Sequence, residues 1–264
     1  MAGTRSLPSE LKAFLWAFSI TNRRSTWMLV GMLSSPVWAI GIGLTFAIHS
    51  PSVISDVSQA RALALGAGYF VVASTVLWNV GSFLVQARDE GTLHACVLSN
   101  GRLPVMMVSR GLVSALFTAP AMAASYAAMS SLLGFPPSAV DPIRTLAAFL
   151  ALHLALVALS MTVGSVFLRM RHAWVVINAL QFVLPATSGM IPPELFPDRF
   201  RSAVILSPFA HPFEALRRAV VGTASLPLTD AELALTSSAS VASLLALGLL
   251  ALALTERSLR RRAF

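Results

Sequence analysis

Residues 146–168 read LAAFLALHLALVALSMTVGSVFL, an apolar run that contains one histidine and no side chain charged at neutral pH. A helix needs about 20 apolar residues to cross the ~30 Å hydrocarbon layer of a membrane. Because lipid offers the backbone no hydrogen-bond partner, such a run must be a helix whose amide groups bond to one another. The run is therefore predicted to span a membrane.

Similar runs lie on both sides of it, and together they give six predicted spans: residues 27–48, 62–87, 104–133, 146–168, 173–190 and 236–254. The expected fold class is an all-α polytopic membrane protein. Residues 1–264 then form a single membrane domain, with an amphipathic helix within 1–26, the six-helix part at 27–254 and a basic tail at 255–264. The loops leave no room for a soluble domain of about 100 residues.

Basic side chains are distributed unevenly between alternate loops. If the amino terminus is cytoplasmic, thirteen of the nineteen Lys and Arg residues lie in inside segments. Cytoplasmic loops carry such an excess, so we expect a multi-pass protein of a prokaryotic plasma membrane with both termini cytoplasmic. The same bias accounts for the net charge of +8 without a nucleic-acid partner. A single cysteine, Cys96, supplies neither a disulfide nor a thiolate metal site.

An amphipathic helix is predicted over residues 8–24, ahead of the first span. Leu11, Phe14, Leu15 and Phe18 recur at helical spacing on one face, and Ser9 is placed to cap the helix. Such a helix lies along the inner leaflet rather than crossing it. Its apolar face either anchors the protein in lipid or docks a partner.

A short helix is predicted in the loop between the second and third spans. Asp89 and Glu90 are expected at its start, where their charge meets the positive end of the helix, and Leu93, Val97 and Leu98 give it an apolar side. Held between two spans, this helix would transmit a force from the cytoplasm to both of them. The alternative is an ordinary solvated loop.

The segment between the fifth and sixth spans is rich in proline, with six prolines between residues 185 and 212. Each proline removes a backbone donor and disfavours helix in the residue before it. Because the pieces between them are apolar and amphipathic, broken re-entrant helices from the outer face are expected. Gly189, Pro192, Pro208 and Phe209 are the candidate gate residues of this segment.

Three amide side chains lie within apolar runs, Asn79 in the second span and Asn178 and Gln181 in the fifth. Facing lipid would be costly, so they are expected to face a pathway or a second subunit, or to bond between helices of one subunit. Val76 is expected to face lipid. His153 is expected to be a hydrogen-bonded core residue, and Ser160 with Gly164 a close-packing notch.

These features together resemble the membrane subunit of a type-2 ATP-binding-cassette (ABC) exporter. The resemblance covers the whole chain and rests on the six-span plan, the amino-terminal helix, the Glu90-Gly91-Thr92-Leu93 segment, and the pattern of Ser188-Gly189, Pro192, Pro208 and Leu216-Arg217 before the last span.

The resemblance implies a second permease copy, or a homologous permease, and two cytoplasmic ATP-binding subunits that hold ATP and magnesium. It also implies that helices two and five line the pathway, and that the amino-terminal helix and the first cytoplasmic loop contact the ATPase. By position the coupling residues are Leu11, Phe14, Phe18, Asp89, Glu90, Gly91, Thr92, Leu93, Val97 and Leu98.

No catalytic site is expected in this chain, which has neither a G-x-x-x-x-G-K-[ST] phosphate loop nor an H-E-x-x-H zinc motif. No cofactor or metal is expected either. A secondary transporter would carry ionisable residues in its spans, and almost none is present besides His153. A membrane scaffold without transport remains a further alternative. The apolar spans suit export of an amphipathic cargo such as a drug, a lipid or a lipid-linked glycan.

Overall fold

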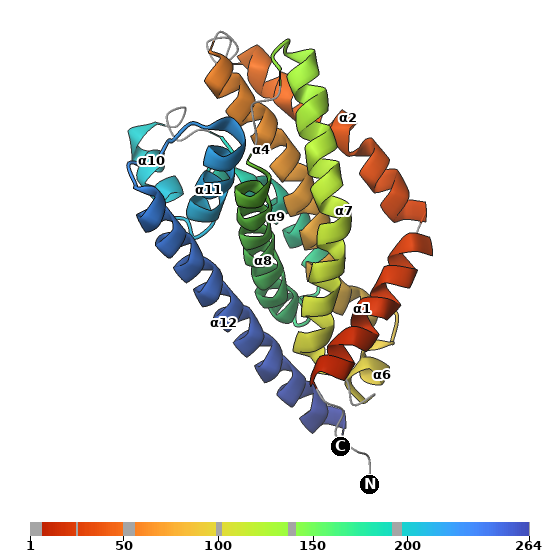
Figure 1. Ribbon diagram of the computed structural model, residues 1–264. Helices are drawn as coiled ribbons and strands as arrows, with labels where there is room; N and C mark the ends of the chain where they lie inside the picture. Colours follow the sequence, from red (N-terminus) through yellow and green to blue (C-terminus); the bar gives the residue numbers. More distant parts are fainter. Residues whose placement is uncertain are drawn as a thin grey trace.

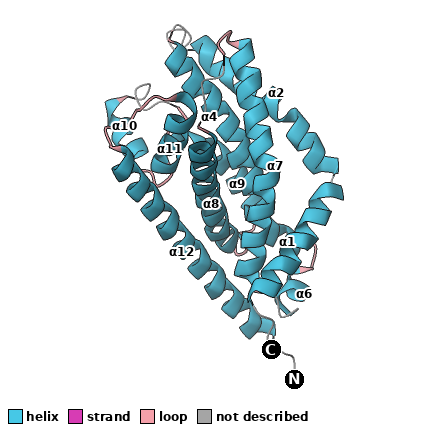
Figure 2. Ribbon diagram, in the orientation of Figure 1, coloured by secondary structure: helices cyan, strands magenta, loops and turns pink. Residues whose placement is uncertain are grey.

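The computed structural model describes residues 7–24, 26–49, 56–98, 102–136, 141–191 and 197–263. Within these ranges the regular structure is helical and contains no strand (Figure 2). The all-helical class expected from the apolar runs is confirmed.

Long helices form the body of the molecule (Figure 1): α2 (Thr26–His49), α4 (Val57–Val76), α7 (Leu103–Leu132), α8 (Pro142–Phe167), α9 (Ala173–Thr187) and α12 (Asp230–Ala263). Their starts follow from local sequence. Pro104 occupies the first turn of α7, where a missing N–H costs nothing. The Asp141 carboxylate accepts bonds from the N–H groups of Ile143 and Arg144 at the start of α8. Hydrogen bonds from Ser58 to the capping carboxylate of α4 hold the pKa of Asp56 below its usual value.

Among the described residues, four helical segments are long and apolar enough to cross a membrane: Val57–Asp89, Leu103–Leu132, Pro142–Phe167 and Asp230–Arg261. Two of the expected spans contain shorter apolar helices, Pro36–Thr45 and Ala173–Leu184. The fifth expected span ended at residue 190, but α9 ends at Thr187, and Gly189 follows with φ +80°. Its 15 residues reach only about 22 Å. Six spans therefore remain a prediction.

The second expected span is not a uniform α-helix. After α4 the backbone continues as the π-helical segment η1 (Leu77–Gly81) and then as α5 (Phe83–Asp89). The Ser82 N–H donates to the Leu77 carbonyl at 3.1 Å, which closes the wide turn. Single π-helical turns are rare and often lie at functional sites.

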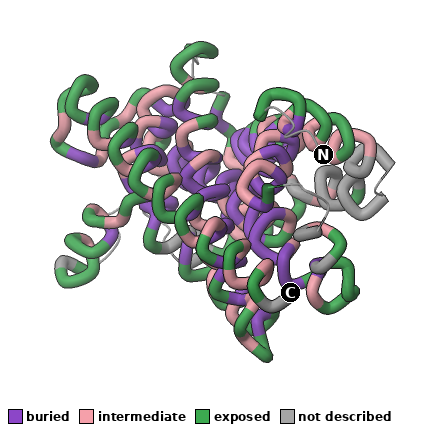
Figure 3. Tube along the Cα trace, turned by 90° about the horizontal axis from the view of Figure 1, so that it is seen from below, coloured by how far each residue is buried: buried purple, intermediate pink, exposed green. Residues whose placement is uncertain are grey.

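Helix α4 lies at the centre, and small residues let its neighbours approach closely. A Cβ atom on Gly66 would lie 2.5 Å from the Met190 carbonyl oxygen, and one on Gly164 would lie 2.9 Å from the Gly81 carbonyl oxygen. The predicted notch at Ser160 and Gly164 is thus confirmed as the place where α8 meets η1. Buried residues gather along the middle of the molecule and exposed residues around it (Figure 3).

His153 lies within this core and is hydrogen-bonded, as expected. Its Nε2 atom is 2.9 Å from the Gly111 carbonyl oxygen and 3.1 Å from Ser114 Oγ. A buried imidazole with partners on α7 is a packing element between α7 and α8.

The remaining helices are short or lie against the bundle: α1 (Leu7–Arg24), α6 (Leu93–Leu98), α10 (Asp198–Ile205) and α11 (Ala210–Val221). Helices α1 and α6 gather at one end of the bundle with the end of α12, whereas α10 and α11 lie toward the other end (Figure 1). Because α1 already begins at Leu7, Ser9 lies inside the helix, and its predicted capping role is wrong. The fold thus separates the expected coupling elements from the expected gate.

Candidate coupling surface, polar face and outer gate

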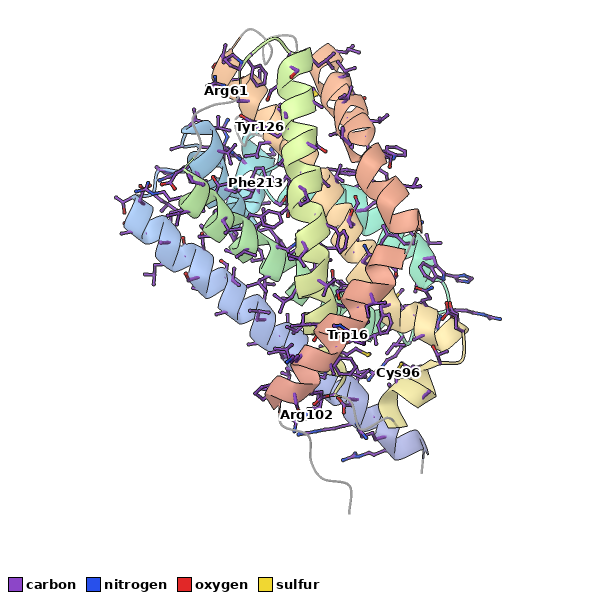
Figure 4. All side chains as sticks on the ribbon, turned by 45° about the vertical axis from the view of Figure 1, so that its right-hand side comes forward. Trp16, Arg61, Cys96, Arg102, Tyr126 and Phe213 are labelled. Atoms are coloured by element: carbon purple, nitrogen blue, oxygen red, sulfur yellow. The ribbon has the colours of Figure 1, made fainter. Side chains whose placement is uncertain are left out.

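The apolar face of α1 packs against the permease itself. Phe14 and Phe18 are half-buried and stack on each other at 6.2 Å between ring centroids, and the edge of Phe18 meets Phe83 of α5. Leu11 is also half-buried. On the opposite face Trp16 points outward and is 69% exposed (Figure 4). The structure therefore leaves the Trp16 face, rather than the Phe14 and Phe18 face, free for lipid or a partner.

Arg110 joins α1 to the π-helical segment. Its guanidinium lies 5.4 Å from the centroid of Phe18 and 4.6 Å from that of Phe83, and its Nε donates to the Asn79 carbonyl. Cation–π contacts of this kind contribute about 0.5 to 2 kcal/mol each. Arg110 lies inside α7, so this charge belongs to a membrane-spanning helix rather than to a loop.

The prediction that Asp89 and Glu90 begin the short cytoplasmic helix is wrong. Asp89 is the last residue of α5 and Glu90 is its C-cap, while α6 begins at Leu93. Gly91, at φ +73°, is the reason, because a left-handed glycine ends a helix and reverses the chain. The two carboxylates are held by neighbours: Asp89 pairs with Arg88 at 2.8 Å, and Gln86 donates to Glu90 at 2.8 Å.

The turn between α5 and α6 has an exposed polar surface, and the buried side chain of Leu93 anchors it in the core. Asp89, Glu90, Gly91 and Thr92 are exposed, and the Thr92 hydroxyl donates to the Ala87 carbonyl at 3.3 Å. Leu93 is buried in the core. Val97 and Leu98 belong to α6, but their side chains lie outside the described residues. Cys96 is half-buried, and desolvation raises the pKa of its thiol.

The amides of α9 form a hydrogen-bonded chain with a tryptophan of η1. Trp78 Nε1 donates to Gln181 Oε1 at 3.0 Å, Gln181 Nε2 donates to Asn178 Oδ1 at 3.2 Å, and Asn178 Nδ2 donates to a backbone carbonyl of α9. The rings of Trp78 and Trp174 stack at 5.6 Å. Asn178 and Gln181 are thus bonded within one subunit, one of the two expected arrangements, on a face that still contacts the outside.

Asn79 is next to Trp78 in η1 and half-buried, and the described part of the structure does not bring its side chain into this chain of bonds. Val76, expected to face lipid, is instead fully buried. Trp78 and Trp174 were not among the predicted site residues, although the spacing of Trp174, Asn178 and Gln181 by four and three residues places them on one face of a helix.

One of the expected gate residues, Gly189, is held by a buried ion pair in α11. Glu214 and Arg217 are 1% and 2% exposed and lie 3.5 Å apart. Arg217 Nη2 donates to the Gly189 carbonyl at 2.6 Å, and its Nη1 donates to Ser225 Oγ. Phe209 is buried at the start of α11, Pro208 is exposed, and Pro192 lies outside the described residues.

Glu214 also organises the chain that follows α11. Its Oε1 accepts bonds from the N–H groups of Ser225 and Leu226 and pairs with Arg218 Nε, four residues further along α11, at 3.1 Å. The ring of Phe213 packs on that of Tyr69 of α4, with 4.9 Å between the ring centroids. The bond from Arg217 to Gly189 joins segments far apart in the sequence, so spacing gave no signal of it.

The sequence of this chain matches a known protein family. The family described as ABC-2 family transporter protein matches residues 49–255, well over half of the chain. A comparison with the curated proteins found no match. The matched range runs from the end of α2 through most of α12 and includes the α5–α6 turn, the polar face and α11. The chain belongs to the ABC-2 transporter family, as a type-2 ABC permease.

Proposed function

We propose that this chain is the permease of an ATP-driven exporter that moves an amphipathic, lipid-like substrate from the cytoplasmic side outward. Membership of the family supports the general role, because its members are the transmembrane components of ABC transporters. The proposal of ATP-driven export rests on the separation of two regions along the bundle. Helices α1 and α6 lie at one end, and α10 and α11 lie toward the other (Figure 1).

The proposed assembly has two copies of the permease, or two homologous permeases, and two cytoplasmic ATP-binding subunits that hold ATP and magnesium. The α5–α6 turn is the proposed contact with the ATPase, since Asp89, Glu90, Gly91 and Thr92 are exposed there while Leu93 is anchored in the core. A displacement of this turn would move α5 and η1 directly, because they are one continuous span.

The proposed pathway follows the face made by η1 and α9. Asn178 is exposed and Gln181 half-buried, and Val175, Phe182 and Val183 of α9 are also exposed. A face of exposed apolar groups around a few bonded amides suits contact with an amphipathic substrate or with the second permease. Gly189, Phe209 and the Arg217 pair lie at the proposed outer closure.

Transport in proteoliposomes tests the proposal. The permease is reconstituted with the ATPase encoded beside its gene, and the efflux of fluorescently labelled phospholipid and of a lipophilic dye is measured with ATP, without ATP, and with an ATPase variant that binds but does not hydrolyse it. The expected result is transport only where ATP is hydrolysed. Transport driven by an ion gradient alone would identify a secondary transporter, and no transport under any condition would identify a scaffold.

A further inference from the structure

A pocket lies where the start of α7 meets the beginning of α1 and the end of α12. Its volume is about 470 Å³, and its walls include the side chains of Arg102, Val105, Leu249, Ala253, Arg257 and Arg260. Arg102 lies at this end of the molecule, near the base of α1 (Figure 4). None of the residues that line it belongs to η1, α9 or α11, so neither the proposed pathway nor the gate accounts for it.

Two carboxylates from other helices fix the geometry of this junction. Glu10 of α1, only 5% exposed, accepts the Arg102 N–H at 2.5 Å, and Glu256 of α12 accepts the Leu103 N–H at 3.1 Å. They cap the first turn of α7, which has no side-chain cap of its own. Because α1, α7 and α12 are tied together here, the walls of the pocket are preorganised.

The pocket is basic on one side. Three arginines and one carboxylate line it, and that carboxylate, Glu256, is already bound to Arg260 at 2.8 Å and to the backbone of Leu103. Arg102 and Arg257 are exposed. The charge that remains is positive and suits an anionic ligand.

The other side of the pocket is apolar and lies within membrane-spanning helices. Val105 belongs to the segment Leu103–Leu132, and Leu249 and Ala253 belong to Asp230–Arg261. Leu249 precedes Arg257 by roughly two helical turns, or about 12 Å along the axis. In this α12 segment only 17% of the most apolar window is buried inside the molecule, so most of that window lies on the surface of the single chain. The ligand therefore meets the basic groups at the membrane surface and the apolar wall below it.

We propose that this pocket binds an anionic phospholipid of the cytoplasmic leaflet. Its phosphate lies against Arg102 and Arg257, and an acyl chain runs along Val105, Ala253 and Leu249. Basic pockets between membrane helices on the cytoplasmic side bind such headgroups. A soluble phosphate ion would contact the arginines but not the apolar wall. Because an acyl chain would contact that wall, a lipid fits the pocket better than a soluble phosphate. The bound lipid would bridge the three helices that meet here.

Lipid retention tests the proposal on the full chain. The protein is purified with equal amounts of phosphatidylglycerol and phosphatidylcholine, and the lipids that stay bound are counted by native mass spectrometry. Each basic group near an anionic lipid strengthens binding about fivefold, so the double variant Arg102→Gln/Arg257→Gln should retain phosphatidylglycerol about 30-fold more weakly. The control Arg169→Gln/Arg171→Gln removes two exposed charges from the α8–α9 turn and should bind as the wild type does.

A second variant tests the apolar wall without changing the charge. Ala253→Trp fills the space beside Val105 and Leu249 and should lower phosphatidylglycerol retention while all three arginines remain. The two variants alter opposite walls of the pocket. If one of them fails to fold, the other still tests whether the pocket retains the lipid. Equal retention of the two lipids by the wild type would overturn the proposal, as would unchanged retention in either folded variant.

Discussion

Arg217 joins α11 to the chain that follows α9. It is buried, it pairs with Glu214, and it reaches across to the Gly189 carbonyl that follows α9. Without Arg217, the buried Gly189 carbonyl would lose its donor, and Glu214 would keep only Arg218 as an ion-pair partner. A buried polar group that loses its partner costs more than a lost surface pair. The packing of α11 against α4 and the placement of the chain after α9 therefore rest partly on one guanidinium.

We predict that Arg217→Met, which keeps much of the side-chain length and removes the charge, destabilises the protein by about 1 to 3 kcal/mol, the cost of a buried polar group that loses its partner. The measurement is the midpoint of thermal unfolding in detergent. Arg199→Met is the matched control, because Arg199 is exposed on α10, and it should change the midpoint little. Equal midpoints for the two variants would show that the buried pair does not hold the segment.

Arg110 has a comparable role at the other end of the bundle, and we predict that Arg110→Ala loosens α1. The substitution removes the cation that lies on Phe18 and Phe83 and the donor to Asn79. Amide hydrogen exchange in α1 and η1 should become faster, while exchange in α8 should stay unchanged. Arg110→Lys should have an intermediate effect, since an ammonium keeps the charge but not the flat stacking surface. Unchanged exchange in α1 would mean that the helix is held by its phenylalanines alone.

Some helices follow from local sequence and others do not. The amphipathic spacing of α1 and the start of α7 near Pro104 are set by residues a few positions apart, which is why they were predictable. The fourth span was expected from residue 146, but α8 already begins at Pro142. The π-helical turn and the ends of α5 and α9 were not. Gly91 was available as a stop signal for α5, but the acidic pair before it was assigned to the next helix. The buried bond from Arg217 to Gly189 and the carboxylate caps on α7 join distant segments, for which a single sequence holds no signal.

The position of Glu90 at the end of α5 leads to a prediction for the α5–α6 turn. At the end of α5 a positive side chain suits the helix dipole, so Glu90→Arg should insert and fold normally although it loses the bond from Gln86. Transport per ATP hydrolysed should nevertheless fall roughly fivefold or more, the range of ordinary coupling energies between sites. Arg169→Glu changes an exposed charge in the α8–α9 turn and serves as the control. An assembled Glu90→Arg complex that transports normally would contradict the coupling role.

At the scale of the whole molecule, the exposed faces indicate how two copies would meet. Helix α9 packs on α4 and η1, while α12 packs on α8 and α11, so their outward faces are separate. The face of α9 combines Asn178 with exposed Phe182, whereas α12 exposes leucines such as Leu247. The mixed polarity of the first suits a protein or substrate contact, and the leucine-rich part of the second around Leu247 suits lipid.

This difference leads to a cross-linking prediction. On a Cys96→Ser background, a cysteine at Phe182 should cross-link two permease chains in membranes, or be protected by substrate, and a cysteine at Leu247 should do neither. Val76 cannot serve as the lipid-facing control because it is fully buried, whereas Leu247 is 52% exposed. If Leu247 cross-links and Phe182 does not, the subunits meet through α12. The pathway proposed along η1 and α9 would then be wrong, while the α12 face beside the lipid pocket would be the dimer contact.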